Sequence, residues 1–218
     1  ELGLLPPSEF LPPIAEHPIS IAIGEWVIDH ALEQINIWSC YGLDLPVSVN
    51  IGAHQLLHSA FKMRLKELLA KHPDVPPDHL ELEILETSAL QDLDQVSSLM
   101  FECVDIGVGF ALDDFGTGYS SLTYLKRLPA AVIKIDQSFV RGMLEDPNDF
   151  AIVVGVVGLA KAFYRQVIAE GVETAEHGES LLKLGCALAQ GYGIARPMSA
   201  QDFLDWAKVW NETHSNKV

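Results

Sequence analysis

The segment Val108-Gly-Phe-Ala-Leu-Asp113-Asp114-Phe-Gly-Thr-Gly-Tyr119-Ser-Ser121 decides the fold of this chain. A short apolar stretch rich in strand formers stops at two adjacent carboxylates, and a Gly-Thr-Gly loop and a helical pattern follow. Adjacent residues of a strand point to opposite faces, so Asp113 and Asp114 can serve one site only if the second lies where the strand gives way to the loop. Carboxylate oxygens suit hard cations such as magnesium or manganese. A lone Asp-Asp pair is more often a helix N-cap with a neighbouring acid. Here, however, apolar stretches that end in polar or acidic residues recur along the chain, and this favours a site.

Five other short apolar stretches also end at polar residues, and helical patterns of period 3.6 separate them. The predicted strands are Leu45–Ile51, Leu80–Leu85, Val108–Leu112, Val132–Ile135, Gln166–Ala169 and Ala187–Ala189. Later helices are predicted at 92–105, 120–127, 148–164, 175–184 and 200–210. Two earlier helices are predicted to have as apolar faces Trp26, Val27, Ala31, Leu32 and Ile35, and Leu57, Phe61, Leu65, Leu68 and Leu69. Strand–helix alternation predicts parallel strands joined by right-handed crossovers.

Polar residues close each predicted strand: Asn50, then Glu83 and Glu86, Asp113 and Asp114, Lys134 and Asp136, Glu170 and Glu173, and Gln190. Polar residues at the carboxyl ends of successive parallel strands are typical of the active face of a TIM-type (β/α)8 barrel. A doubly wound α/β sheet is the runner-up, but it gathers its site at one switch point. Because a barrel needs about eight strands, we expect the first strands to precede residue 1. The domain is then expected at 1–210, N-terminally incomplete, with a polar tail at 211–218.

Each of these residues also has a simpler interpretation. Asn50 is an amide ligand for magnesium or a turn and cap residue. Glu83 shares a strand face with Glu81, and it either needs a cation inside the barrel or lies on a solvated edge strand. Lys134, held between apolar neighbours, either stabilises charge at a phosphoryl group or forms an ion pair with a nearby carboxylate.

The last two strands leave similar alternatives. Glu170 is a candidate second-metal ligand or base, and Gly171 permits a tight turn just after it. For Glu173 the preferred interpretation is a cap of the following helix. Gln190 can hold a water or a substrate oxygen, or make an ordinary hydrogen bond.

Composition and missing motifs exclude several classes of function. A formal charge of −16 argues against binding to a nucleic-acid polymer, but a metal would still allow a small anionic substrate to bind. The cysteines Cys40, Cys103 and Cys186 are odd in number and far apart, so they are predicted to be buried thiols of a reducing compartment. The sequence shows no Ser-His-Asp pattern, phosphate-binding Gly-Lys loop or dinucleotide fingerprint.

Together these segments closely resemble the EAL domain, the bacterial phosphodiesterase family that hydrolyses cyclic di-GMP. The similarity runs from Leu5 to about Trp206. Its motifs are Pro7-Ser-Glu-Phe, Ile23-Gly-Glu-Trp-Val, Val49-Asn-Ile-Gly-Ala-His-Gln-Leu56, Leu82-Glu-Ile-Leu-Glu86, Asp113-Asp-Phe-Gly-Thr-Gly-Tyr-Ser-Ser121, Lys134-Ile-Asp, Ala169-Glu-Gly-Val-Glu-Thr174 and Gln190-Gly-Tyr.

The resemblance implies a two-metal site, for Mg²⁺ or Mn²⁺, whose ligands by position are Asn50, Glu83, Asp113, Asp114 and Glu170. Two such cations can clamp an in-line displacement at phosphorus. The implied reaction is hydrolysis of cyclic di-GMP to linear pGpG.

The resemblance also implies roles for the remaining polar residues. Lys134 would orient or activate the hydrolytic water, and Gln190 would contact that water or the substrate, so both count with Glu170 as catalytic. Glu86 would anchor the loop Phe115–Ser121, which links metal binding, substrate binding and dimerisation in the family, and Glu173 would support that loop network.

The Glu-Ala-Leu triplet that names the family is absent, and by similarity it would fall before residue 1. Its glutamate is a metal ligand in relatives, so the alternative is a catalytically inactive EAL domain that acts as a cyclic di-GMP receptor or interaction module. The partners expected from the resemblance are cyclic di-GMP, a second copy bound through the loop after Asp114 and its neighbouring helix, and an upstream sensory or diguanylate-cyclase domain. A cytoplasmic location is expected, with any membrane anchor upstream.

Overall fold

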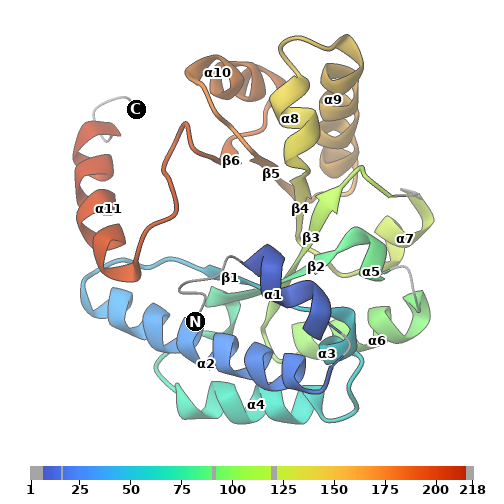
Figure 1. Ribbon diagram of the computed structural model, residues 1–218, viewed down its shortest axis with the longest axis vertical. Coiled ribbons are helices and arrows are strands. Elements are labelled where there is room, and N and C mark those ends of the chain that lie inside the picture. Colours follow the sequence, from blue (N-terminus) through green and yellow to red (C-terminus); the bar gives the residue numbers. More distant parts are fainter. Residues whose placement is uncertain (1–6, 16, 90–91, 119–121, 215–218) are drawn as a thin grey trace.

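In the part of the chain that the structure describes, six parallel strands form one curled sheet in the order in which they occur in the sequence (Figure 1). The computed structural model describes residues 7–15, 17–89, 92–118 and 122–214. The strands are β1 (Val47–Asn50), β2 (Leu80–Leu85), β3 (Gly109–Phe115), β4 (Val132–Ile135), β5 (Gln166–Glu170) and β6 (Leu188–Gln190). Sequential order has no switch point, so the doubly wound alternative is wrong. The sheet is an open half-barrel with β1 and β6 at its edges, and the predicted β/α-barrel architecture is confirmed.

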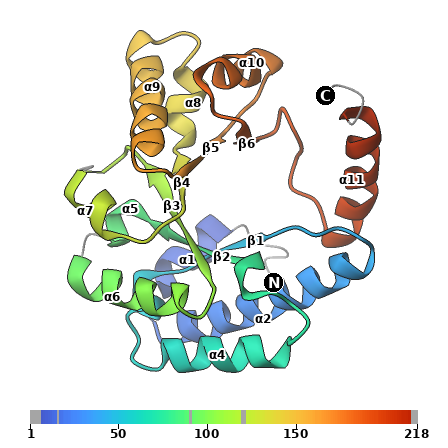
Figure 2. The same cartoon turned by 180° about the vertical axis from the view of Figure 1, so that it is seen from behind.

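The helices of the described residues are α1 (Pro7–Ile14), α2 (Ile19–Cys40), α3 (Ala53–Leu56), α4 (Phe61–Lys71), α5 (Glu86–Ala89), α6 (Leu93–Val104), α7 (Leu122–Arg127), α8 (Gln137–Gly142), α9 (Pro147–Ala162), α10 (Ala175–Leu184) and α11 (Ala200–His214), with one 3₁₀ turn at Pro77–His79. Helices α1 and α2 precede the first strand, the other helices follow strands, and α11 stands apart from the sheet (Figure 2). The first turn of α11 packs on the last turn of α2, where Trp38 Nε1 donates a hydrogen bond to the carbonyl of Ala200 at 3.2 Å.

Side-chain caps explain where several helices begin. Asp92, Asp136 and Asp146 each accept a hydrogen bond from a backbone N–H in the first turn of α6, α8 and α9. Ser199 Oγ accepts from the backbone N–H of Asp202 at 3.1 Å and donates to its carboxylate at 2.7 Å, as the capping-box spacing predicts.

The core lies between the sheet and its outer helices. Two predictions about it were wrong, namely that Trp26 belongs to the buried face of its helix and that Cys40 is buried. Helix α2 buries Ile28, Leu32 and Ile35, while Trp26 is 60% exposed and lies against His30 with their rings tilted by 39°. The buried residues are spaced i, i+4, i+7, and Trp26 lies about 200° from Ile28 around the helix. Cys40, at the exposed end of the same helix, is not buried.

The carboxyl-terminal helix is longer than the sequence pattern indicated. Helix α11 extends to His214, four residues beyond the predicted end at 210. Thr213 Oγ1 donates a hydrogen bond to the carbonyl of Val209 one turn earlier, which is compatible with a helical last turn. Among the described residues, no helix is both long and apolar enough to cross a membrane.

Candidate active site at the carboxyl ends of the strands

The register of the sheet places six of the predicted site residues on one face. Asn50 pairs with Glu83, and Glu83 pairs with Ala111, two residues before Asp113 on the same face of β3. Ala111 pairs with Val132, so Lys134 also lies on this face. Lys134 pairs with Ile168, two residues before Glu170, and Glu170 pairs with Gln190. Side chains from all six strands therefore share the concave face near the carboxyl ends.

A β-bulge adds Asp114 to this set. Between the pairs Leu112–Ile133 and Phe115–Ile135, β3 contains one more residue than β4, so Asp113 and Asp114 both stand opposite Lys134. Asp114 has a φ of 53°, in the left-handed region that Asp tolerates better than most residues. The bulge cancels the alternation that would otherwise turn the two adjacent carboxylates to opposite faces.

Lys134 lies where the carboxylates converge. Its Nζ atom is 2.8 Å from Glu83 Oε2, 3.0 Å from Asp113 Oδ1 and 2.7 Å from Glu170 Oε1. Burial alone would lower the pKa of Lys134, but its hydrogen bonds with Glu170 and Glu83 and the charge of Asp113 raise that pKa above its ordinary value. In this arrangement the three carboxylates favour the protonated form of Lys134, which can donate hydrogen bonds.

These contacts exclude one interpretation of Glu83 and show one of the two interactions expected of Lys134. Glu83 is only 6% exposed, so its interpretation as part of a solvated edge strand is wrong. The ion pair that was the simpler interpretation of Lys134 is present, with three carboxylate partners in place of one.

The carboxylates outnumber the ammonium group, which fits a site for divalent cations. Oxygen atoms of Asp113, Asp114 and Glu170 lie within 4.8 Å of one another. Asp113 Oδ1 is buried, has no hydrogen-bond partner among the described residues and lies 3.0 Å from the ammonium nitrogen of Lys134, which it shares with two other carboxylates. One ammonium group cannot neutralise four neighbouring carboxylates, and a divalent cation would offset the remaining buried negative charge.

Charge repulsion within the cluster is visible at Asp114. Burial, the charge of Asp113 and a hydrogen bond with Asp136 raise the pKa of Asp114 to about 6. Asp136 also caps α8 by accepting from the backbone N–H of Ser138 at 2.9 Å. Asp136 therefore belongs to the polar cluster, although the predicted set of site residues did not include it. The Lys134-Ile-Asp136 spacing was the available signal, because residues two apart on a strand share a face.

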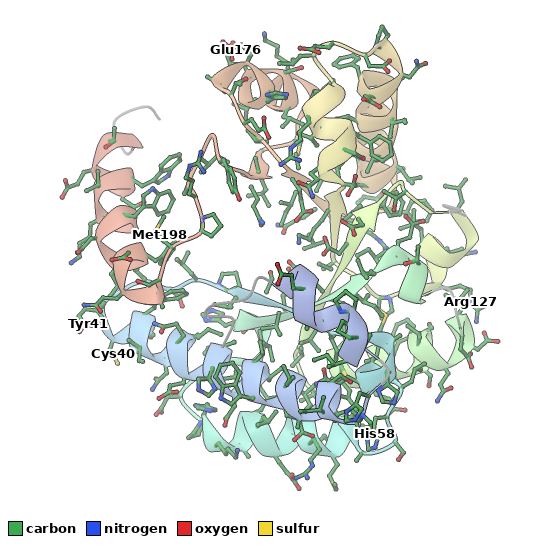
Figure 3. The ribbon with its side chains drawn as sticks, in the orientation of Figure 1. Cys40, Tyr41, His58, Arg127, Glu176 and Met198 are labelled. Carbon is green, nitrogen blue, oxygen red and sulfur yellow. The ribbon has the colours of Figure 1, made fainter. Side chains whose placement is uncertain are left out.

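The outermost strands place the two amides. Asn50 on β1 and Gln190 on β6 are both exposed, and they lie on the two edge strands of the open sheet. Gln190 also lines a groove of about 520 Å³ between β6 and α11, together with Trp38, Tyr192, Met198, Phe203 and Trp206. Met198 is labelled in Figure 3, on the segment leading into α11.

Glu86 contacts the start of the loop that follows β3. It is fully buried, and its Oε2 atom accepts a hydrogen bond from the backbone N–H of Gly116 at 2.9 Å. A Cβ atom on Gly118 would lie 3.0 Å from Glu86 Oε1, so a larger residue would crowd this contact. Residues 119–121, the end of the predicted Phe115–Ser121 loop, lie outside the described residues.

Glu173 does not cap the next helix. Thr174 is the N-cap of α10, and its side chain accepts from the backbone N–H of His177. Glu173 is exposed and instead pairs with Arg141 of α8, with 2.8 Å between Oε1 and Nε. The helix begins one residue later than the capping interpretation required.

Comparison with known proteins now identifies the family. The model of the EAL domain family matches residues 1–197 of the chain. The chain belongs to the EAL domain family.

Characterised relatives carry names that describe cyclic di-GMP enzymes. The bifunctional diguanylate cyclase/cyclic di-GMP phosphodiesterase MucR of Pseudomonas aeruginosa is 40% identical over 203 residues, which cover 93% of this chain and 30% of MucR. The cyclic di-GMP phosphodiesterase PdeR of Escherichia coli is 37% identical over 212 residues, covering 95% of this chain and 31% of PdeR. The chain thus spans about a third of the length of these relatives.

A solved EAL structure matches the fold closely. The PaMucR phosphodiesterase in complex with c-di-GMP superimposes with a TM-score of 0.89 and 40% identity, over 93% of this chain and 82% of that one. The half-barrel described above is therefore the fold of an EAL domain.

Proposed function

We propose that this EAL domain is a metal-dependent phosphodiesterase that hydrolyses cyclic di-GMP to linear pGpG. The observation that carries the proposal is the single polar face formed by Asn50, Glu83, Asp113, Lys134, Glu170 and Gln190, with Asp114 added by the bulge. The named relatives support the choice of substrate, because two of them are named as cyclic di-GMP phosphodiesterases.

The proposed ligands for two Mg²⁺ or Mn²⁺ ions are Asn50, Glu83, Asp113, Asp114 and Glu170. When bound, two such ions would supply positive charge that lowers the pKa of a water molecule and offsets negative charge at phosphorus. The clustering of Asp113, Asp114 and Glu170 and the excess of carboxylates over the single ammonium of Lys134 support this assignment.

The chain's own groups would orient the remaining partners. Linear pGpG carries its free phosphate on a 5′ oxygen, so water oxygen adds to phosphorus while the P–O3′ bond breaks and the 3′ oxygen takes up a proton. The protonated Lys134 would donate a hydrogen bond to the attacking water or to a phosphoryl oxygen. Gln190, on the edge strand β6, would hold the substrate. Glu170 would take up a proton or position the second cation.

Glu86 and Glu173 are proposed as supports of the loop that begins at Phe115. The hydrogen bond from Gly116 to Glu86 supports the first role, and the ion pair with Arg141 is the contact available for the second. We also propose that a second copy binds through this loop and α7, where Leu122 is 60% exposed. Light scattering of the chain with and without cyclic di-GMP measures that association.

The test is a hydrolysis assay with cyclic di-GMP, run on this chain and on the product of its full gene. We expect pGpG to form with Mg²⁺ or Mn²⁺ and not with EDTA, and turnover to fall steeply in Lys134→Met and Asp113→Asn. Lys161→Met is the matched control, because Lys161 is exposed and contacts the carbonyl of Leu184. Normal turnover in Lys134→Met contradicts the proposed role of this residue. Tight binding of cyclic di-GMP without pGpG, in both proteins, replaces the enzyme with the receptor alternative.

A further inference from the structure

Helix α7 directly follows the loop that begins after Asp113 and Asp114, and it is only six residues long. An isolated helix of this length is not stable in water, so contacts with the rest of the domain must hold it. Leu125 within the helix and Leu128 just after it are buried. Because only three residues link Gly118 to Leu122, the position of α7 constrains where the loop ends.

The carboxyl end of α7 is held by one side chain from the segment between α9 and β5 and by one from α6. Arg165 Nη2 donates hydrogen bonds to the carbonyls of Leu125 and Leu128, the latter at 2.7 Å. Ser97 of α6 donates to the carbonyl of Arg127 at 2.9 Å; Arg127 is labelled beside α7 in Figure 3. These carbonyls lie at a helix end, where they lack helical partners and where a positive charge is favourable.

The Arg165 side chain is costly at this position. Its Nη1 atom is buried without a hydrogen-bond acceptor among the described residues. An apolar side chain would avoid the desolvation of an unpaired N–H group. The guanidinium group instead links α7 to the segment between α9 and β5. The backbone of Arg165 is itself held to α9, because its N–H donates a hydrogen bond to the carbonyl of Ala160 at 2.9 Å.

We propose that Arg165 is a positioning residue for the loop after Asp113 and Asp114, because it fixes the carboxyl end of α7 and so the point where the loop ends. Glu86 fixes the other end of the loop through Gly116. The expected effect on metal binding rests on the proposed function. The expected effect on the mobility of the loop does not.

Hydrogen exchange measured by mass spectrometry tests the mobility directly. In Arg165→Met, we expect amides of Gly116–Gly118 and Leu122–Arg127 to exchange at least about fivefold faster than in the wild type, because a helix end has lost its stabilising contacts. Arg165→Lys keeps one charged donor and should restore part of the protection. Lys161→Met is the matched control, since it removes a lysine contact to the end of α10 and should leave these amides unchanged.

Binding of Mn²⁺, followed by the electron paramagnetic resonance signal of the free ion, gives a second readout. We expect several-fold weaker binding in Arg165→Met, partial recovery in Arg165→Lys and no change in Lys161→Met. Unchanged exchange in Arg165→Met overturns the inference, as does a loss of protection that is uniform across the domain. Absence of cyclic di-GMP hydrolysis in the wild type would refute the proposed function but leave the exchange result as the test of this inference.

Discussion

The Nζ atom of Lys134 on β4 lies 2.7 Å from Oε1 of Glu170 on β5, and the two side chains are only 5% and 15% exposed. The same ammonium group contacts carboxylates of β2 and β3. One cation thus joins four neighbouring strands at the face where the proposed metal ligands lie, and Lys134 and a divalent cation are attracted to the same oxygen atoms.

Replacing Lys134 by Met should strongly destabilise the protein when divalent cations are absent. Removing one partner of a buried ion pair leaves uncompensated charges, so we expect the free energy of unfolding in EDTA to fall by about 3–5 kcal/mol. Urea denaturation at pH 8 measures this. Mn²⁺ should recover more stability in the mutant than in the wild type. The control is Lys208→Met, which replaces an exposed lysine and should change the free energy of unfolding little. The prediction is contradicted if Lys134→Met loses no more stability than Lys208→Met.

Asp114→Asn should stabilise the metal-free protein at neutral pH. The pKa of Asp114 is raised to about 6, from an ordinary value of 3.8, by burial, by the charge of Asp113 and by the hydrogen bond with Asp136. A raised pKa means that the native state binds the proton more tightly, so Asp114 favours folding below pH 3.8 and loses this contribution as pH rises through 6.

The stability difference between Asp114→Asn and the wild type should therefore be largest above pH 7 and shrink toward pH 4. Because Asp114 is only partly buried, solvent screening keeps the gain below about 1 kcal/mol. Thermal unfolding in EDTA across this pH range measures it. Asp205→Asn, an exposed carboxylate on α11, should show no such trend. An Asp114→Asn protein that gains stability at low pH would reverse the expected sign.

Tyr164→Gly should stabilise the domain by about 1 kcal/mol. Tyr164 is 98% exposed and has a φ of 55°, a left-handed conformation that costs a residue with a Cβ atom about 1–2 kcal/mol. Tyr164→Ala is the matched control, because it also removes the ring but keeps the Cβ atom and the cost. Equal unfolding midpoints in urea for the two variants would show that the backbone is not strained there.

The three cysteines should differ in their reaction with a disulfide reagent such as Ellman's reagent. Cys40 is exposed, while Cys103 and Cys186 are buried, and burial raises the pKa of Cys103 to about 11. At pH 8 we expect one thiol to react quickly in the native protein and all three after unfolding. Cys40→Ser should abolish the fast phase. A fast phase that persists in this variant would mean that a buried thiol is accessible.

Strand positions could be predicted because apolar runs with sharp polar ends leave few alternatives. The bounds of β2 and β4 agree with the prediction, and each other strand is shifted at one end or both. Helix α2 shows the limit of such patterns, since Trp26 fits the apolar stripe by composition but is 60% exposed, while Ile28 on another face is buried. The choice among near-equivalent helix faces depends on which neighbour packs there.

The shared face of Asn50, Glu83, Asp113, Lys134, Glu170 and Gln190 followed from the sequence, because a side-chain period of two and a parallel register place strand-end residues together. Three features depended on tertiary structure alone: the bulge that joins Asp114 to Asp113, the three carboxylates around Lys134, and the contact of Arg165 with α7. Each arises between elements distant in the chain. Local propensity specifies where a strand ends, but only the packing of neighbouring strands and helices determines which charges meet there.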